Sequence, residues 1–280
     1  IEQAGESLSI AAWGNGGQSI GRRGSINGAG TIVTLTEAMD AQNFEVGMDL
    51  VSSLNDGATA TDALLTGVAT LTGVGREDGT LTAADWADFS SFANGDYLFR
   101  ASDFAGDTGN VIMKGVQAFI TQTSTPPALW GVTAATRLTD PQRLAGCRVP
   151  NAELAGKTID ERIKILLSRM TSRFKAKRPT AGWINDEDFQ VLETLMAAKG
   201  VRTLEDDTTQ FGFAKINIAT TAGMLPIFCD RHVPKGNFFA LRMEDWGIST
   251  MGELTHFQDA DDLTILRRSA STDLEARLIS

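Results

Sequence analysis

Apolar and polar side chains alternate along residues 211–241, and this stretch predicts three strands joined by two turns. The apolar positions of the first two strands are Phe211, Phe213, Ile216, Ile218, Leu225, Ile227 and Phe228. These two strands meet at Ala222-Gly223, which predicts a β-hairpin. Residues 233–236, Val-Pro-Lys-Gly, predict a second turn, because proline fixes φ and glycine accepts a positive φ. A third strand follows with Phe238, Phe239 and Leu241.

Helical spacing of apolar positions occurs twice before this stretch. Residues 158–161, Thr-Ile-Asp-Glu, form a capping box that begins the first predicted helix. Its apolar face consists of Ile159, Ile163, Leu166, Leu167, Met170 and Phe174. Three cations follow at the negative end of the helix dipole before Pro179 ends the helix, namely Lys175, Lys177 and Arg178.

The second predicted helix begins at Asn185 and ends at Gly200. Three acids occupy its first turn, where the helix dipole favours negative charge: Asp186, Glu187 and Asp188. Its buried face consists of Phe189, Leu192, Leu195 and Met196. Residues 180–185 lie between the two helices and predict a short buried strand.

Glycines and short β-branched runs dominate the N-terminal part of the chain. Residues 1–30 begin as the tail of a helix and continue as a glycine-rich loop, because a dense run of glycines disfavours helix. Residues 31–104 contain short apolar runs separated by Asp-Gly and Asn-Gly-Asp turns, which predict a small β-barrel-like insertion. Asp78-Gly79 gives its strongest hairpin signal. Such an insertion is either a tolerated decoration or a surface that contacts neighbouring molecules.

Composition narrows the class of protein. The 280 residues can bury a sizeable core as one elaborated domain or two. The net charge of -10 argues against sequence-independent nucleic-acid binding, which needs clustered Lys and Arg. The two cysteines, Cys147 and Cys229, predict buried thiols in a reducing compartment and no disulfide or zinc site. No run approaches the ~20 apolar residues of a transmembrane helix and no signal peptide is recognised, so we expect a soluble protein that works inside a cell.

One segment of the chain fits a known catalytic motif. Residues 17–21, Gly-Gln-Ser-Ile-Gly, fit the nucleophile elbow of α/β-hydrolases, with Ser19 as nucleophile and His232 or His256 downstream. That elbow needs a strand before it and a helix after it, and the following Arg22-Arg23-Gly-Ser cannot begin a helix that packs on a sheet. A serine hydrolase is therefore the distant alternative, and we expect that the chain is not an enzyme.

Other candidate sites have weaker signals. Residues 16–21 have the gap of a phosphate loop, but Arg22-Arg23 replaces the required Lys-Ser/Thr, and residues 259–262 lack the Gly and Glu of a calcium loop. The sequence thus predicts no catalytic residue, no metal site and no cofactor. The cation pairs Arg22-Arg23 and Arg267-Arg268 indicate either a solvated face or bridges to carboxylates of neighbouring subunits.

Several short motifs follow the order found in one protein family. They are Met-Lys-Gly-Val-Gln-Ala-Phe-Ile at 113–120, Trp-Ile-Asn at 183–185, G-F-x-x-I-x-I at 212–218, T-x-x-G at 220–223, Asp-Arg at 230–231, V-P-x-G at 233–236 and D-x-E-A-R at 273–277. With these motifs, residues 105–280 resemble the major capsid proteins of tailed bacteriophages, whose fold is shared by encapsulin compartments.

The resemblance implies an α+β subunit with the HK97-like capsid fold. It assigns the end of the spine helix and a glycine-rich loop of the peripheral domain to residues 1–30, the β-rich insertion to 31–104, a peripheral-domain segment to 105–157, the central (axial) domain to 158–236 and the return to the peripheral domain to 237–280. The return is expected to contain a strand around Trp246 and Ile248, an acidic turn at 259–262 and a last strand at 263–266. An N-terminal arm, an extended loop and most of the spine helix are expected before Ile1.

The function implied is structural. Major capsid proteins self-assemble as hexamers and pentamers into an icosahedral shell that encloses double-stranded DNA, so the implied location is the virion, assembled in the cytoplasm of a bacterial host. The implied partners are further copies of the chain, with portal, scaffolding or decoration proteins, and the DNA is enclosed without strong sequence-specific binding. No membrane is involved. An encapsulin-type compartment, which encloses protein cargo, is the alternative within the same fold.

Overall fold

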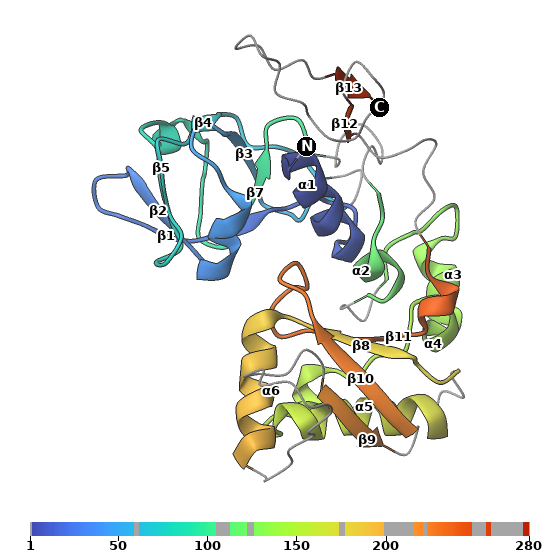
Figure 1. The fold of residues 1–280 in the computed structure, drawn as a ribbon. Coiled ribbons are helices and arrows are strands. Elements are labelled where there is room, and N and C mark those ends of the chain that lie inside the picture. The colour runs from blue at the N-terminus through green and yellow to red at the C-terminus, as the bar shows by residue number, and fades with distance from the viewer. Residues whose placement is uncertain are drawn as a thin grey trace.

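The computed structural model describes residues 2–58, 62–104, 113–121, 126–173, 177–198, 216–220 and 223–247, together with the short strands at 256–258 and 277–279. Helices and sheets are both present, as predicted for the α+β class. Two sheets, each with its own apolar core, form the two main parts of the described chain (Figure 1). None of the described helices is long and apolar enough to cross a membrane.

A seven-stranded antiparallel sheet occupies the N-terminal half, in the order β4-β3-β7-β1-β2-β6-β5. Its strands are β1 (Gly21–Ile26), β2 (Ile32–Leu35), β3 (Asp49–Ser53), β4 (Ala69–Thr70), β5 (Gly73–Gly75), β6 (Thr80–Thr82) and β7 (Tyr97–Arg100), and the short 3-10 helices η1 (Ala38–Asn43) and η2 (Asp85–Asp88) accompany them. The two edge strands, β4 and β5, follow one another in the chain, so the sheet curls around a single core. Phe44, Leu50, Leu81, Trp86 and Leu98 are fully buried in that core.

The sheet begins at Gly21, within the segment that the sequence predicted as a glycine-rich loop. A Cβ atom on Gly24 would lie 2.9 Å from the carbonyl oxygen of Leu35 on β2, and one on Gly21 would lie 3.0 Å from the ring of Phe44. These glycines therefore let strand β1 approach its neighbours closely, which is the other use of glycine in a strand. The expectation of a loop at 21–26 was wrong for this reason. The helix expected before it is present as α1 (Glu2–Trp13).

The hairpin predicted at Asp78-Gly79 is confirmed. Strands β5 and β6 pair antiparallel, with Gly73 opposite Thr82 and Gly75 opposite Thr80. Gly79 has φ +63, the left-handed conformation for which glycine was expected. The connection runs over residues 76–79 and is longer than the expected two-residue turn.

The second sheet has the strand order β11-β8-β10-β9, with β8 parallel to β10 and the other pairs antiparallel. Its strands are β8 (Ala181–Ile184), β9 (Ile216–Thr220), β10 (Gly223–Cys229) and β11 (Phe238–Leu241). The predicted hairpin is confirmed, because β9 and β10 pair from Gly223 opposite Thr220, and Gly223 has φ +100. Phe211, Phe213 and residues 221–222 lie outside the described residues.

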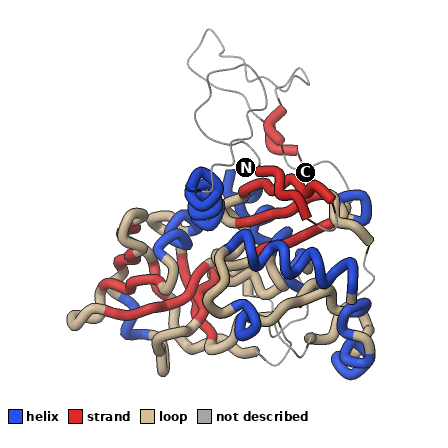
Figure 2. The backbone as a smooth tube through the Cα atoms, turned by 90° about the horizontal axis from the view of Figure 1, so that it is seen from below, coloured by secondary structure: helices blue, strands red, loops and turns tan. Residues whose placement is uncertain are grey.

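Two helices, both predicted from the sequence, cover one face of this sheet. They are α5 (Ile159–Ser172) and α6 (Asp186–Ala198). Their buried residues share one core with those of the strands, namely Ile163, Leu167, Met170, Phe189, Leu192 and Met196 with Ile184, Ile216, Ile218, Leu225 and Ile227. Figure 2 shows the backbone from below, with the helices in blue beside the strands in red. Both halves of the predicted capping box are present at Thr158 and Glu161, while Phe174, Lys175 and Gly200 lie outside the described residues.

Aromatic side chains cover the opposite face of the same sheet. Phe239 and Leu241 of β11 pack with Val116 and Val233, and Trp13, Trp183 and Trp246 border this cluster. Trp246 was expected in a strand, but it follows the 3-10 helix η4 (Met243–Asp245) and its ring meets Phe119 edge-on at 5.4 Å. Its ring packs against Phe119 and the aromatic cluster. The apolar pattern around Trp246 was therefore due to tertiary packing and not to the alternation of a strand.

Short helices connect the two halves: α2 (Val116–Phe119), α3 (Ala134–Thr139), α4 (Pro141–Leu144) and the 3-10 helix η3 (Asn151–Leu154). Arg137 of α3 is 1% exposed and donates hydrogen bonds to the backbone oxygens of Pro127, Ala118, Phe119 and Leu144. Burial lowers the pKa of this guanidinium. Strands β12 (His256–Gln258) and β13 (Arg277–Ile279) pair antiparallel, and the expected elements at 259–266 lie outside the described residues.

Candidate functional site

The loop that leads from β10 to β11, residues 230–237, is the junction loop of the molecule. The sequence predicted its turn at 233–236, and Gly236 has φ +78 while the backbone N–H of Asn237 donates to the oxygen of Pro234 at 3.2 Å. Val233 is 1% exposed and anchors the loop in the aromatic cluster. The loop therefore holds its shape through its own turn and one buried side chain.

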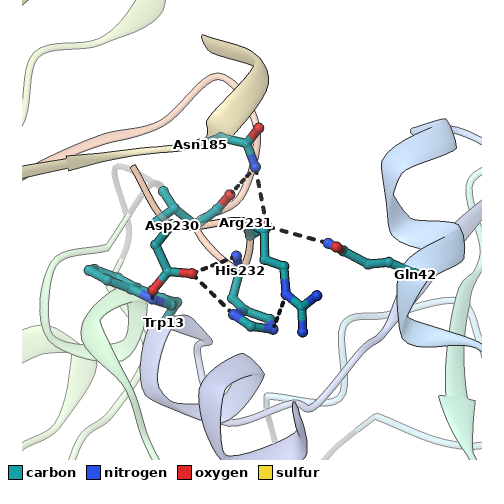
Figure 3. A network of polar contacts seen from close by, with 7 residues as sticks. Trp13, Gln42, Asn185, Asp230, Arg231 and His232 are labelled. Carbon is teal, nitrogen blue, oxygen red and sulfur yellow. Dashed lines mark hydrogen bonds and ion pairs between the residues drawn. The ribbon is translucent and has the colours of Figure 1, made fainter. Parts of the chain in front are cut away.

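Three parts of the chain converge on the start of this loop (Figure 3). Trp13, at the end of α1, donates from Nε1 to Oδ2 of Asp230 at 2.9 Å. Gln42, on η1 of the seven-stranded sheet, donates to the backbone oxygen of Arg231 at 3.4 Å. Asn185 donates from Nδ2 to the backbone oxygens of Arg231 and Val233, at 3.3 and 2.8 Å. The loop thus links α1 and both sheets.

Asn185 has a second role at the start of α6. Its Oδ1 accepts from the backbone N–H of Glu187 at 3.0 Å, so it satisfies one of the unpaired donors at the helix N-terminus. The side chain is 1% exposed. One buried amide therefore fixes both the start of α6 and the junction loop.

Asp230 and His232 form the polar centre of the loop. Oδ1 of Asp230 accepts from the backbone N–H of His232 at 2.9 Å and lies 3.1 Å from His232 Nδ1. Burial by itself would raise the pKa of Asp230, but the hydrogen bonds from His232 and from Trp13, with the charge of His232, lower it to about 2. The carboxylate is therefore held in its charged form.

Lys235 links the two sheets from the far end of the loop. Its Nζ lies 2.7 Å from Oε2 of Glu187 on α6 and 3.3 Å from Oε2 of Glu37, which precedes η1. Hydrogen bonds to the two carboxylates raise the pKa of Lys235. Next to it, the backbone N–H of Gly236 donates to Oδ2 of Asp188 at 2.6 Å. Two of the three acids in the first turn of α6 thus bind the junction loop.

A cleft of about 390 Å³ runs along this junction, and its lining includes Ser19, Asp40, Asn43, His232 and Lys235. Burial, with the nearby charge of Glu37, raises the pKa of Asp40 to about 7, although Lys235 acts in the opposite direction. Asp40 is thus a carboxyl group that takes up a proton near neutral pH. The cleft could hold a small polar ligand, but most of its polar side chains already contact the protein itself.

The structure brings Ser19 and His232, the two members of the hydrolase alternative, to the same cleft. Ser19 Oγ donates to the backbone oxygen of Gly21 at 3.1 Å and is 3.5 Å from that of Leu98, while both ring nitrogens of His232 face Asp230 and Arg231. Ser19 is followed by strand β1, where a nucleophile elbow requires a helix. The elbow geometry is therefore not formed. His256 lies in β12, far along the chain.

The structure also shows the surroundings of the two cysteines and of the cation pair Arg22-Arg23. Cys147 is half-buried, but Cys229 is exposed at the end of β10, so the expectation that both are buried was wrong for Cys229. Although the residue as a whole is exposed, partial shielding of its thiol from solvent, with the charge of Asp186, raises the pKa of Cys229. Arg22 donates to the oxygen of Gly95 at 3.0 Å and Arg23 is 8% exposed against the ring of Phe92, so both cations are held within the chain. Arg267 and Arg268 lie outside the described residues.

Sequence reasoning did not find Trp13, Asp40 or Lys235 as members of this junction. Their partners are distant in sequence, so the local spacing of residues does not predict such contacts. Within the junction loop, the sequence predicted only the turn at 233–236. Within the described part of the chain, no group of three His, Cys, Asp or Glu side chains could hold a metal ion. Searches for relatives found no matching protein-family model, no matching curated protein and no matching solved structure.

Proposed function

We propose that this chain is the major capsid protein of a tailed bacteriophage, a subunit with the HK97-like capsid fold that self-assembles into an icosahedral shell around double-stranded DNA. The observation that carries the proposal is the order of elements from α5 to β11. A capped helix, a strand with the Trp183-to-Asn185 motif, a helix with an acidic first turn, a hairpin and a returning strand follow one another, in the order that the resemblance implies.

The position of the seven-stranded sheet supports the same proposal. It lies between α1 and α2, so it interrupts the path from the expected spine helix to the peripheral segment at 113–120. Strands β1 and β7 are paired neighbours, with Gly21 opposite Leu98. An inserted domain has this form, because its chain enters and leaves at one place.

Exposed apolar side chains support an assembling subunit. Trp130 is 75% exposed, and Val132, Leu138 and Leu144 around α3 and α4 are 40%, 43% and 42% exposed. Large apolar side chains left exposed within one short segment favour a surface that another molecule covers. In a shell, every subunit has neighbours that can cover such a group.

The junction also suits a structural role. Asp230, Asn185 and Lys235 bind other parts of the chain, so they hold the two sheets together. In the proposed shell they would keep each subunit rigid. The shell would be assembled in the cytoplasm of the bacterial host and persist in the virion, with portal, scaffolding or decoration proteins as further partners.

Expression of the complete reading frame and electron microscopy of the purified particles test the proposal. We expect closed icosahedral shells, and in particles from infected cells we expect double-stranded DNA that resists nuclease until the shell is opened. Shells that contain a protein cargo, identified by mass spectrometry, would assign the chain to the encapsulin-type compartments instead. A chain that forms no shell at any ionic strength would refute both.

A further inference from the structure

Charge is distributed unevenly along this chain. Residues 31–104 contain twelve acidic and two basic residues, a formal charge of -10. Residues 143–178 contain ten basic and three acidic residues, a formal charge of +7. The net charge of the whole chain is -10, and this single value does not reveal the strongly basic segment at 143–178. Such asymmetry indicates a surface that attracts an oppositely charged partner.

The acidic charge forms an edge on the seven-stranded sheet. Two turns meet there, because Arg76 in the β5–β6 connection pairs with Glu45 at 2.8 Å. Glu77 and Asp78 next to it are exposed, and Val46 beside Glu45 is 63% exposed. We call Glu45, Val46, Glu77 and Asp78 the acidic edge. It combines negative charge with one exposed apolar side chain, and Arg76 offsets the charge of Glu45, so the excess negative charge lies on Glu77 and Asp78.

The basic charge follows the outer face of α5. Lys164, Arg169 and Arg173 line a shallow groove of about 760 Å³ between α5 and the end of β9, and Ile165 and Ala219 form its apolar part. Arg169 and Arg173 also border a second groove of about 340 Å³, which Arg148 and Glu153 help to line. The two grooves therefore form one continuous surface, which we call the basic face.

The two surfaces do not neutralise each other within one molecule. The ion pairs of Lys164 and Arg169 are with Asp160 and Glu153, which belong to the same segment. Arg173 and Lys177 are exposed. Figure 1 shows the β5–β6 hairpin and α5 at opposite ends of the described chain. Among the described residues, no ion pair joins the two surfaces within one molecule.

We propose that the basic face of one copy binds the acidic edge of a second copy, in a head-to-tail contact between neighbouring subunits. The inference rests on the proposed function, since it names a contact through which the shell assembles. Two unlike surfaces that join in this way make a heterologous interface, which closes into a ring when the rotation between copies permits it. Hexamers and pentamers are rings of this kind.

Two observations favour a second copy over nucleic acid as the occupant. The groove places Ile165 and Ala219 beside its cations, and these apolar side chains match Val46 among the acids of the edge. The remainder of the chain outside 143–178 carries a formal charge of -17 and repels a polyanion over long range. A second copy carries a net charge of -10 spread over the whole molecule, far below the density of one charge per about 1.7 Å on duplex DNA, so this repulsion is weaker for a second copy.

Charge reversal followed by charge exchange tests the contact. Lys164→Glu with Arg173→Glu reverses the basic face, and Glu77→Lys with Asp78→Lys reverses the acidic edge. We expect each pair to lower the assembled fraction at physiological salt by at least about tenfold, since a few ion pairs are replaced by repulsion. The four substitutions together restore opposite charges across the contact, and we expect assembly to recover to within about threefold of the original.

The matched control is Arg143→Glu with Lys157→Glu. Both residues are exposed cations of the same segment, neither lines the two grooves, and the change in net charge is the same. This variant should assemble like the original chain. Circular dichroism of each variant shows whether it is folded, and sedimentation velocity with electron microscopy measures association and shells separately.

The outcomes separate the inference from the proposed function. Shells that form equally well after either charge reversal, or fail to recover in the fourfold variant although it folds, overturn the inference alone. Salt-sensitive association without shells overturns the proposed function alone, and a chain that stays monomeric at all salt concentrations overturns both. Retardation of double-stranded DNA that is lost in the Lys164→Glu, Arg173→Glu variant, with assembly unchanged, assigns the basic face to nucleic acid and refutes the contact.

Discussion

The indole Nε1 of Trp13 donates a hydrogen bond to Oδ2 of Asp230 at 2.9 Å, although the two residues are 217 positions apart. Trp13 ends α1, and Asp230 begins the junction loop after β10. Because Asp230 is charged and partly buried, the bond is of the stronger, charge-assisted type. The last turn of α1 and the junction loop therefore take their native positions together.

Replacement of Trp13 by Phe removes this hydrogen bond and leaves most of the ring packing. We expect Trp13→Phe to lower the free energy of unfolding by about 2 kcal/mol more than Trp183→Phe does. Trp183 is the matched control, because it lies 5.6 Å from Trp13 in the same cluster and its Nε1 has no partner among the described residues. Urea denaturation followed by circular dichroism measures both, and equal losses would contradict the assigned hydrogen bond.

The acid response of the protein should depend on His232. The folded-state pKa of Asp230, about 2, lies below the ordinary value of 3.8, so this carboxylate stabilises the fold above pH 4 and loses that contribution as the pH falls toward 2. His232→Leu removes the ring hydrogen bond, and we expect it to destabilise the protein at pH 5 but much less at pH 2. Denaturation curves at the two pH values check this. A penalty that is the same at both would show that His232 acts through packing.

Asp40 predicts the opposite pH dependence. Its folded-state pKa of about 7 lies above 3.8, so the native protein holds a proton that the unfolded chain releases, and stability falls as the pH rises from about 4 to above 7. At about 1.4 kcal/mol per unit, the loss is at most about 4 kcal/mol. Asp40→Asn should remove this decline, while Asp88→Asn, at the exposed end of the 3-10 helix η2, should keep it. Glu37 and Lys235 are the charged groups that act on Asp40, and Lys235→Met should extend the decline to higher pH because Lys235 lowers the pKa of Asp40.

The capping box at Thr158 gives a prediction for α5. Thr158→Ala removes the side-chain oxygen that satisfies the helix N-terminus, and we expect a loss of about 1 kcal/mol in unfolding free energy. Thr158→Ser keeps the oxygen and should retain most of the stability. Thermal unfolding compares the two. The Thr171→Ala variant of the same helix is the control, because Thr171 bonds only to backbone oxygens one turn earlier.

Two glycines of the N-terminal segment should respond very differently to alanine. A Cβ on Gly17 would lie 1.8 Å from the backbone oxygen of Asp56, whereas a Cβ on Gly28 would meet no atom within 4 Å. We expect Gly17→Ala to cost about 3 kcal/mol and Gly28→Ala to stay within about 0.5 kcal/mol. Chemical denaturation of both variants is decisive, and a tolerated Gly17→Ala would refute the close approach of these two segments.

Local signals in the sequence predicted the elements that local physics determines. The capping box at Thr158, the acids that begin α6 and the positive φ of Gly79 and Gly236 each depend on a few neighbouring residues. The same holds for the hairpin of β9 and β10. Such features can be predicted from the sequence because the interactions that stabilise them lie within one turn or one strand pair.

Long-range packing determined the features that the sequence did not reveal. Gly21 and Gly24 allow close approach in a strand, yet in sequence they are indistinguishable from loop glycines. Arg137 is buried because four distant carbonyl groups surround it, and Lys235 joins Glu37 to Glu187 across the fold. The pattern of a segment gives no information on partners of this kind, so most of the candidate site was beyond prediction.

The pairing of β1 with β7 has a practical consequence. Because Gly21 lies opposite Leu98, the two ends of the seven-stranded sheet leave the rest of the molecule a single strand spacing apart. The sheet can therefore be replaced as one unit. A short turn, or a foreign domain whose termini lie equally close, can be inserted between residues 20 and 101. Among the described residues, Gln42 and Glu37 make the hydrogen bond and the ion pair with the junction loop that such a graft would have to supply again.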